Sequence, residues 1–240
     1  MRIMRTTLHT TWVFLATLLL AGTASIALAV PDPKTDNDPQ PIVADTINEL
    51  IRRLEKNRDQ IKVDESIAYS ISEELVTPRI DFPRIAQLVV GKHWRNASAT
   101  QRQHLTDEIQ TLLTRSYVTA MTSYTDDIIA NKDRISYETS RYQPGDRKAS
   151  VRATIQIDNG QTVEVQYQVY LNEGVWKIYD IRIEGISLAI TYRTSFGETI
   201  LREGLDGLIQ QLAERNRNGE VELPDTITKP LIKKTGTTQP

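Results

Sequence analysis

The spacing of apolar residues divides the chain into a helical first part, a region of strands and a final helix. Between residues 43 and 124, apolar residues recur every three or four positions, which is the period of an amphipathic helix. This spacing predicts four helices, of which the third follows Asp81 and stops at Gly91, and the fourth and longest opens at Ser98. Gln101 lies three residues after Ser98, so a capping box defines the start of the longest helix.

From Ile135 the apolar period changes to two, as in strands with one buried face. The turn sequences Asp158-Asn159-Gly160 and Asn172-Glu173-Gly174 separate successive segments of this kind. The predicted strands cover residues 136–142, 151–157, 163–171 and 175–183. We therefore expect an α+β fold, in which a curved antiparallel sheet of about four to five strands is covered on its apolar face by helices.

The final helical segment follows Gly185 and has an unusually wide apolar surface. Its regular stripe consists of Leu201, Leu205, Leu208, Ile209 and Leu212. Phe196 and Ile200 point away from this stripe, and three glycines interrupt the segment between positions 197 and 207. Either the helix breaks near these glycines, or it is apolar on two sides because it borders both the core and a cavity. We favour a break.

Residues 1–29 have the features of a secretory signal peptide. Arg2 and Arg5 precede an apolar run that ends at Leu20, and the small-residue sequence Ala27-Leu28-Ala29 follows it. We expect cleavage after Ala29 and export of the rest of the chain. The alternative is an uncleaved membrane anchor, which is disfavoured because the apolar run is short for a span of about 20 residues.

Composition separates two terminal segments from one central domain. Residues 30–41 carry four prolines among polar residues, which predicts a flexible leader. Residues 218–240 are also polar and contain prolines, so we expect a disordered tail. The remaining residues, 42–217, are enough for one domain with a hydrophobic core.

Charge and residue usage exclude several classes of function. The chain has 29 basic and 31 acidic residues and no basic cluster, which argues against binding to nucleic acid or to an anionic membrane surface. It has no cysteine, and after residue 29 only His93 and His104, so a Cys/His metal site is excluded. Neither histidine has a setting that favours a Ser-His-Asp triad, because His104 lies on a predicted helix and His93 in a loop beside Trp94. Motifs such as GxSxG, HExxH and Walker A are absent. The protein is therefore expected to hold a ligand, not to convert one.

Two segments, residues 81–124 and 175–212, carry short sequence features that together are specific for one protein family. The marks are Gly91, Trp94-Arg95, Ala97-Ser98, Gln101, the helix around Tyr117, Trp176-Lys177-Ile178-Tyr179-Asp180, Glu184-Gly185-Ile186-Ser187, Tyr192-Arg193 and Phe196. On these marks the chain resembles the toluene-tolerance family of MlaC-type periplasmic phospholipid-binding proteins, part of the Mla lipid-asymmetry pathway. The resemblance covers about residues 42–216.

The resemblance implies that the sheet and helices enclose an apolar pocket for phospholipid tails, with the head group near solvent. It also implies a soluble periplasmic carrier, monomeric and without a cofactor, whose cargo is phospholipid. Such a carrier shuttles lipid between an outer-membrane lipoprotein complex and an inner-membrane ABC transporter that bears MCE domains, and so maintains outer-membrane lipid asymmetry.

Candidate lining residues are the apolar side chains that the periodicity places on the inner faces of the helices and the sheet. They are Ile85, Leu88, Val89, Leu113, Tyr117, Met121, Tyr124, Ile155, Val165, Tyr167, Val169 and Ile178. For each of them the alternative is ordinary packing in a solid core. Arg95 and Arg193 are candidates for contact with a lipid phosphate, because a guanidinium matches its geometry. The alternative for both arginines is a structural pairing with Asp or Glu.

Two other functions compete with the carrier. The fold could be filled solid and serve as a non-catalytic periplasmic docking module of a transport system, without a lipid cavity of its own. An enzyme acting on lipids or esters would need an acid/base pair converging in a pocket, and the sequence reveals no such pair.

Overall fold

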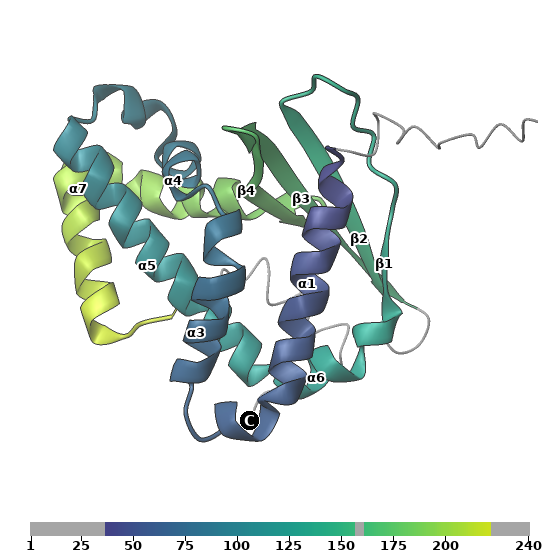
Figure 1. Cartoon of the computed structure of the whole chain (residues 1–240). Coiled ribbons are helices and arrows are strands. Elements are labelled where there is room, and N and C mark those ends of the chain that lie inside the picture. The colour runs from purple at the N-terminus through teal and green to yellow at the C-terminus, as the bar shows by residue number, and fades with distance from the viewer. Residues whose placement is uncertain (1–36, 157–160, 222–240) are drawn as a thin grey trace, which may run out of the picture. The chain divides into compact units, whose positions relative to one another are not determined.

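The computed structural model describes residues 37–156 and 161–221 (Figure 1). The predicted signal peptide, most of the predicted leader, the first hairpin turn and most of the predicted tail lie outside these residues. Within them, helices come first, then the strands, then one last long helix. No helix in this part of the chain combines the length and the apolar character needed to cross a membrane.

The elements before the sheet are mainly helical. They are α1 (Pro39–Lys56), α2 (Arg58–Ile61), α3 (Ser66–Leu75), η1 (Thr77–Arg79), α4 (Phe82–Val90), η2 (Gly91–Asn96), α5 (Ala99–Ser123), α6 (Thr125–Ala130) and η3 (Lys132–Arg134), where η denotes a short 3₁₀ helix. The sheet and the last helix comprise β1 (Ile135–Tyr137), β2 (Lys148–Gln156), β3 (Thr162–Asn172), β4 (Val175–Ile183), β5 (Ile186–Ser187) and α7 (Leu188–Asn218).

The five strands form an antiparallel sheet in chain order, so each strand pairs with the next. The predicted α+β class and the predicted meander are confirmed. Glu173 and Gly174, both with positive φ, make the expected turn between β3 and β4. Glu184 and Gly185 have positive φ as well and turn the chain into β5. This short strand was not predicted, because the sequence was expected to pass from these residues directly into the helix.

Helix α1 begins earlier than the predicted end of the leader. It starts at Pro39, inside the segment 30–41, and the side chain of Asp38 caps it by accepting a hydrogen bond from the backbone N–H of Gln40 at 2.9 Å. Proline is tolerated here because the first turn of a helix has no intrahelical partner for its N–H groups. The prolines that predicted an irregular leader therefore open the helix instead.

The predicted helix ends around α4 and α5 are confirmed. Asp81 caps α4 by accepting from the N–H of Arg84 at 3.1 Å, and Gly91 ends it with a φ of 63°. At the start of α5, Ser98 Oγ accepts from the N–H of Gln101 at 3.1 Å, and Gln101 Oε1 accepts from the N–H of Ser98 at 3.0 Å. Both bonds of the predicted capping box are therefore present.

Helix α7 is broken at Gly204, where φ is 74° and ψ is −173°. The break explains why two apolar directions coexist in this segment, and of the two alternatives it is the one that the sequence favoured. Phe196 and Ile200 before the break and Leu208 after it enter the same buried cluster. Leu201, predicted to belong to the stripe, is instead 75% exposed, because the change of direction at Gly204 separates its face from that of Leu208.

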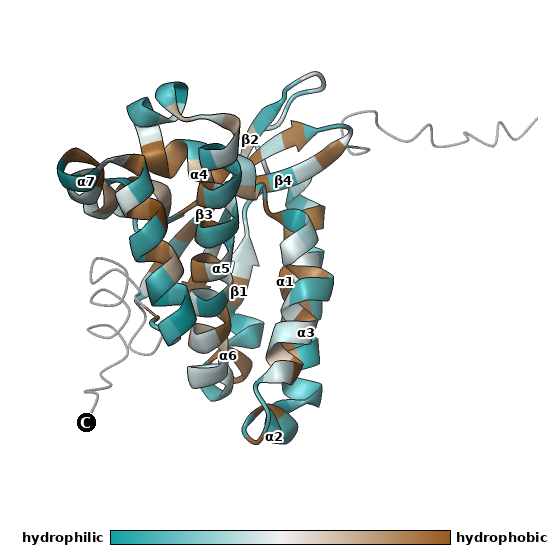
Figure 2. Ribbon diagram, turned by 90° about the vertical axis from the view of Figure 1, so that its left-hand side faces the viewer, coloured by the Kyte–Doolittle hydropathy of each residue, from teal (hydrophilic) through white to brown (hydrophobic). Residues whose placement is uncertain are grey.

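The buried apolar side chains of the described residues form three clusters. The α4–α5–α7 cluster includes Val89, Leu105, Ile109, Phe196, Leu208 and Leu212; the α1–α3–α5 cluster includes Leu54, Ala68, Ile71, Val118 and Met121; and the sheet cluster joins Val43 of α1 to Val151, Val169 and Trp176. Figure 2 shows apolar, brown positions interspersed with polar, teal ones along α4, α5 and α7, as expected of helices that each bury one side. A domain of this size usually has one contiguous hydrophobic core, whereas the core of the described residues is divided into three separate clusters.

Candidate functional site

The inner face of the sheet forms the first wall of the candidate site. The strand register places Tyr137, Ala153, Val165 and Ile183 in one row across the sheet, and Val151, Tyr167 and Ile181 in the next. Side chains of this face pack against Ile42, Val43 and Ile47 of α1 within the sheet cluster. None of the side chains in the two rows is charged, so the face offers an apolar surface with two phenol hydroxyls.

Some side chains of this face and of helix α4 are not fully buried. Tyr167 lies on β3, a central strand flanked by β2 and β4, and yet its side chain is only half-buried, as is that of Ile178 on β4. On the helical side, Ile85 and Leu88 of α4 are also half-buried, although they pack against the α4–α5–α7 cluster. Side chains in a closely packed interior keep almost no accessible surface, so these four positions are less tightly packed than the buried members of the same clusters.

The structure distributes the predicted lining residues over the three clusters. Ile85, Leu88, Val89 and Leu113 belong to the α4–α5–α7 cluster, Tyr117 and Met121 to the α1–α3–α5 cluster, and Tyr167, Val169 and Ile178 to the sheet cluster. Ile155 and Val165 lie on the inner face of the sheet outside these clusters. Tyr124 is not with them: it is the C-terminal cap of α5 and 37% exposed.

Tyr117 ties two helices together at this site. Its hydroxyl accepts a hydrogen bond from Ser72 Oγ of α3 at 2.7 Å and lies 3.4 Å from Thr77 Oγ1 of η1. The segment after η1 is joined to the sheet in turn, because the N–H of Asp81 donates to the carbonyl of Ile178 at 2.8 Å. Helices α3 and α5 and strand β4 are thus held around the interior by polar contacts at its border.

The two candidate head-group arginines have different surroundings. Arg193 Nε donates to the carbonyl of Leu88 at 2.6 Å, and the side chain lies against Gly91, where an added Cβ would come within 3.2 Å of Nε. Arg193 therefore joins α7 to α4 through a backbone carbonyl, not through the carboxylate that the alternative named. The side chain of Arg95, on η2, is exposed. Contact with a phosphate stays a prediction for both.

Asp180 fixes the start of α7 to strand β4. Its buried carboxylate accepts from Ser187 Oγ at 2.7 Å and from the N–H of Ala189 at 3.1 Å. A negative charge at the N-terminus of a helix is favourable, because the unpaired N–H groups there carry partial positive charge. Sequence reasoning singled out Asp180 as a family mark but assigned it no role.

Sequence reasoning also missed Tyr137, which shares the inner face with Tyr167. The Tyr137 hydroxyl is buried and has no hydrogen-bond partner among the described residues. Burial raises the pKa of Tyr137 to about 12, and burial together with the neighbouring Tyr137 raises the pKa of Tyr167. Both phenols are therefore protonated at neutral pH. The only signal in the sequence was the position of Tyr137 within a predicted strand.

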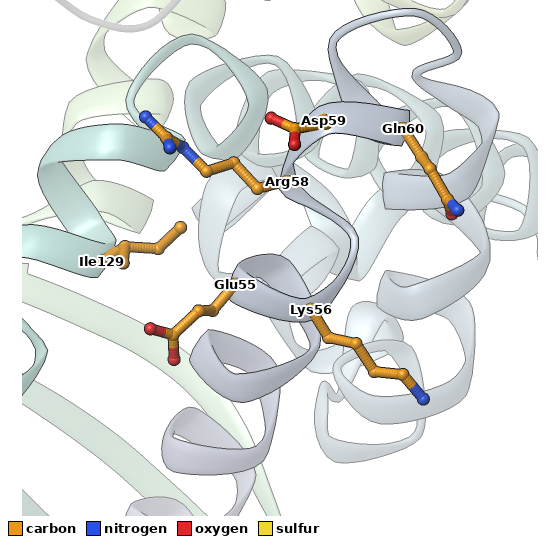
Figure 3. Close-up of a pocket in the computed structure, with 6 residues that line it drawn as sticks. All are labelled: Glu55, Lys56, Arg58, Asp59, Gln60 and Ile129. Carbon is orange, nitrogen blue, oxygen red and sulfur yellow. The ribbon is translucent and has the colours of Figure 1, made fainter.

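A separate pocket of about 440 Å³ is formed by the end of α1, by α2 and by α6 (Figure 3). Its lining residues are Glu55, Lys56, Arg58, Asp59, Gln60 and Ile129. Ion pairs surround it: Lys132 Nζ donates to Glu55 at 2.7 Å, and Arg58 Nε donates to Asp126 at 2.5 Å. This pocket shares no residue with the predicted lining, and its charged walls are unsuited to acyl chains.

The described residues hold no group of three or more His, Cys, Asp or Glu side chains that could bind a metal ion. The interior between sheet and helices offers apolar side chains and hydroxyls. It defines a class of α+β protein in which helices cover the apolar face of an open antiparallel sheet.

Comparison with known proteins narrows this class. The family model described as MlaC protein matches residues 44–214, and the chain belongs to this family. The chain is 26% identical over 169 residues to the toluene tolerance protein ttg2D of Pseudomonas putida, and the alignment covers 70% of this chain and 75% of that one. It is 21% identical over 182 residues to the intermembrane phospholipid transport system binding protein MlaC of Haemophilus influenzae, covering 75% and 82%.

A solved structure matches the fold as well. The phospholipid-binding protein of Ralstonia solanacearum, in complex with a phospholipid, superposes with a TM-score of 0.64 at 29% identity. The match covers 76% of this chain and 98% of that one. The resemblance inferred from the sequence is confirmed at the level of the family and the fold.

Proposed function

We propose that this protein binds phospholipid, with the acyl chains between the inner face of the sheet and helices α4 and α5. The observation that carries the proposal is that apolar side chains on a helix and on the sheet, such as Ile85 of α4 and Ile178 of β4, are only half-buried although they belong to buried clusters. Membership of the MlaC family and the similarity to a structure that contains a phospholipid support the same function.

The energetics suit a carrier. Each buried methylene contributes ~0.8 kcal/mol, so two long acyl chains contribute on the order of 20 kcal/mol and do not cross water unshielded. Binding of this strength would also retain the lipid indefinitely. Release therefore requires a partner that opens the interior or offers the chains an equally apolar route.

The need for a partner leads to the transport cycle that we propose. In the proposed cycle the protein, exported to the periplasm after cleavage of its signal peptide, receives phospholipid from one membrane complex and delivers it to another. The partners are an outer-membrane lipoprotein complex and an inner-membrane ABC transporter with MCE domains. The protein acts as a monomer, without a cofactor and without a catalytic step.

Lipid extraction tests the proposal directly. Purification without detergent, followed by organic extraction and mass spectrometry, is expected to recover phospholipid in stoichiometric amount, and native mass spectrometry is expected to show the corresponding mass increment. Protein recovered folded but free of lipid contradicts the proposal and favours a docking module with a solid core.

A matched pair of substitutions locates the lipid. Val165 lies on the inner face of β3 and Gln166 on its outer face. Val165→Phe is expected to lower the amount of lipid recovered per protein, because the larger ring occupies the proposed lipid volume. Gln166→Phe adds a ring to the same strand on the other face and is expected to leave the lipid content unchanged. An equal effect of the two variants would place the lipid elsewhere.

A further inference from the structure

Two tyrosines lie close together on the inner face of the sheet. Tyr137 on β1 is opposite Ala153 of β2, and Tyr167 on β3 is opposite Val151, the next inward position of β2. Ala153 has the smallest side chain in its row, so the two phenol rings can lean toward each other over β2. The effect of Tyr137 on the pKa of Tyr167 agrees with this proximity.

The Tyr137 hydroxyl is an unpaired polar group in an apolar interior. It is buried, and no described residue accepts or donates a hydrogen bond to it. Burying a hydroxyl without a partner is unfavourable, and most buried side-chain polar atoms have one. Tyr117 follows the general rule, because its hydroxyl is paired with Ser72 and Thr77. The different state of Tyr137 suggests that its partner comes from outside the chain.

The surroundings define the chemistry of that partner. A protonated phenol is a hydrogen-bond donor, and a neutral carbonyl oxygen is an acceptor that can enter an apolar interior at small cost. A phosphate is charged, and neither row of the inner face offers it a cation. The hydrocarbon of an acyl chain offers no acceptor. In a diacyl glycerophospholipid, two ester carbonyls lie where the chains join the glycerol, and the site has two hydroxyls.

We propose that Tyr137 and Tyr167 donate hydrogen bonds to the two ester carbonyl oxygens of a diacyl glycerophospholipid. This inference rests on the proposed function, since it places the same lipid at a defined depth. The tyrosines fix the level at which the glycerol lies along the sheet, and the acyl chains extend from there between sheet and helices. The protein therefore distinguishes ester-linked from ether-linked lipids, although their chains and head groups are identical.

A competition experiment tests this selectivity. The purified protein is incubated with vesicles of equimolar dioleoyl phosphatidylcholine and its diether analogue, and the lipid bound to the re-isolated protein is quantified by mass spectrometry. The wild-type protein is expected to retain the diester form in excess. Tyr137→Phe is expected to reduce the diester-to-diether ratio by about 2- to 10-fold, the range for one neutral hydrogen bond. Tyr167→Phe acts in the same direction, and the double variant brings the ratio close to unity.

The control is Tyr170→Phe, because Tyr170 lies on the outer face of β3 with its ring centre 3.9 Å from the guanidinium carbon of Arg84. The diester-to-diether ratio of the Tyr170→Phe variant is expected to equal that of the wild type. The ratio is measured within one protein sample, so a small loss of stability does not affect it. Equal ratios for the wild type and Tyr137→Phe, with both lipids bound, overturn this inference and leave the proposed function standing. If the wild type binds neither lipid, the proposed function fails and this inference with it.

Discussion

The α4–α5–α7 cluster and the inner face of the sheet are both apolar, but they are packed differently. In the helical cluster, Leu105, Ile109 and Leu208 have at most 1% of their surface exposed. On the sheet, Val151 and Val169 are as deeply buried, but Tyr167 and Ile178 remain half-buried, and the hydroxyl of Tyr137 has no partner among the described residues. The sheet face therefore combines closely packed positions with positions that stay accessible. Under the proposed function, the ligand supplies the missing contacts at the accessible positions.

The largest effect expected from this difference concerns two isoleucines. Ile109→Ala, in the helical cluster, is expected to lower the free energy of unfolding of lipid-free protein by about 3–4 kcal/mol, because it leaves a cavity in a filled core. Ile178→Ala, on the sheet, is expected to cost about half as much or less, because its side chain is only half-buried and loses fewer contacts. Denaturant titration measures both. Equal losses would show that the sheet side is filled as tightly as the helical side.

The next effect concerns the contact that joins the two regions. Asp180→Ala is expected to lower the free energy of unfolding by about 2 kcal/mol, because Ser187 Oγ and the N–H of Ala189 lose a charged acceptor in a buried setting. Asp107→Ala is the control, since this exposed side chain of α5 accepts from Gln103 within the same helix. Denaturant titration again measures both, and a loss no larger than that of the control would contradict the role given to Asp180.

A smaller effect separates two tyrosine hydroxyls, one paired and one unpaired among the described residues. Tyr117→Phe is expected to destabilise lipid-free protein by about 1 kcal/mol, because Ser72 loses its partner. Tyr137→Phe is expected to leave lipid-free protein equally stable or slightly more stable, because it removes a hydroxyl without a partner among the described residues. Thermal unfolding of delipidated samples compares the two. Destabilisation by Tyr137→Phe in the absence of lipid would mean that its hydroxyl is already paired.

A further effect, confined to alkaline conditions, is a dependence of stability on pH. Burial raises the pKa of Tyr137 to about 12 in the folded protein, whereas an unfolded tyrosine has a pKa of about 10. The unfolded state therefore loses its proton first, and the contribution of Tyr137, complete below pH 10, declines as the pH rises from about 10 to 12. Unfolding titrations across this range should show a shallower decline in Tyr137→Phe than in the wild type. The same slope in both proteins would contradict the assigned burial.

Local signals made much of the fold predictable. The capping box of Ser98 and Gln101 and the stop at Gly91 depend on residues close in sequence, and the structure has both. The start of α1 was misjudged because proline disfavours the middle of a helix but suits its first turn, and composition alone does not distinguish the two positions. The exposure of Leu201 was missed because the change of direction at Gly204 depends on tertiary packing.

The candidate site was less predictable. Alternation along β2 and β3 identified the inward face correctly, because the period of two is local. The partner of Arg193 is a backbone carbonyl 105 positions away, which no pattern of side chains could reveal. The pairing of Tyr117 and the unpaired state of Tyr137 also depend on contacts between distant elements. Periodicity assigns a residue to a face, but it does not report how well the opposite wall fills the space above it.

The order of the strands has a further consequence. The sheet is open, and its two edges are its shortest strands, β1 with three residues and β5 with two. An edge strand presents unpaired backbone groups on which another chain can add a strand, and short edges leave little length for such an addition. Strand β3 is paired along its length with β2 and β4, whereas β1 covers three residues of β2 and β5 covers two residues of β4. Strand addition on β1 or β5 is therefore limited to a few backbone groups.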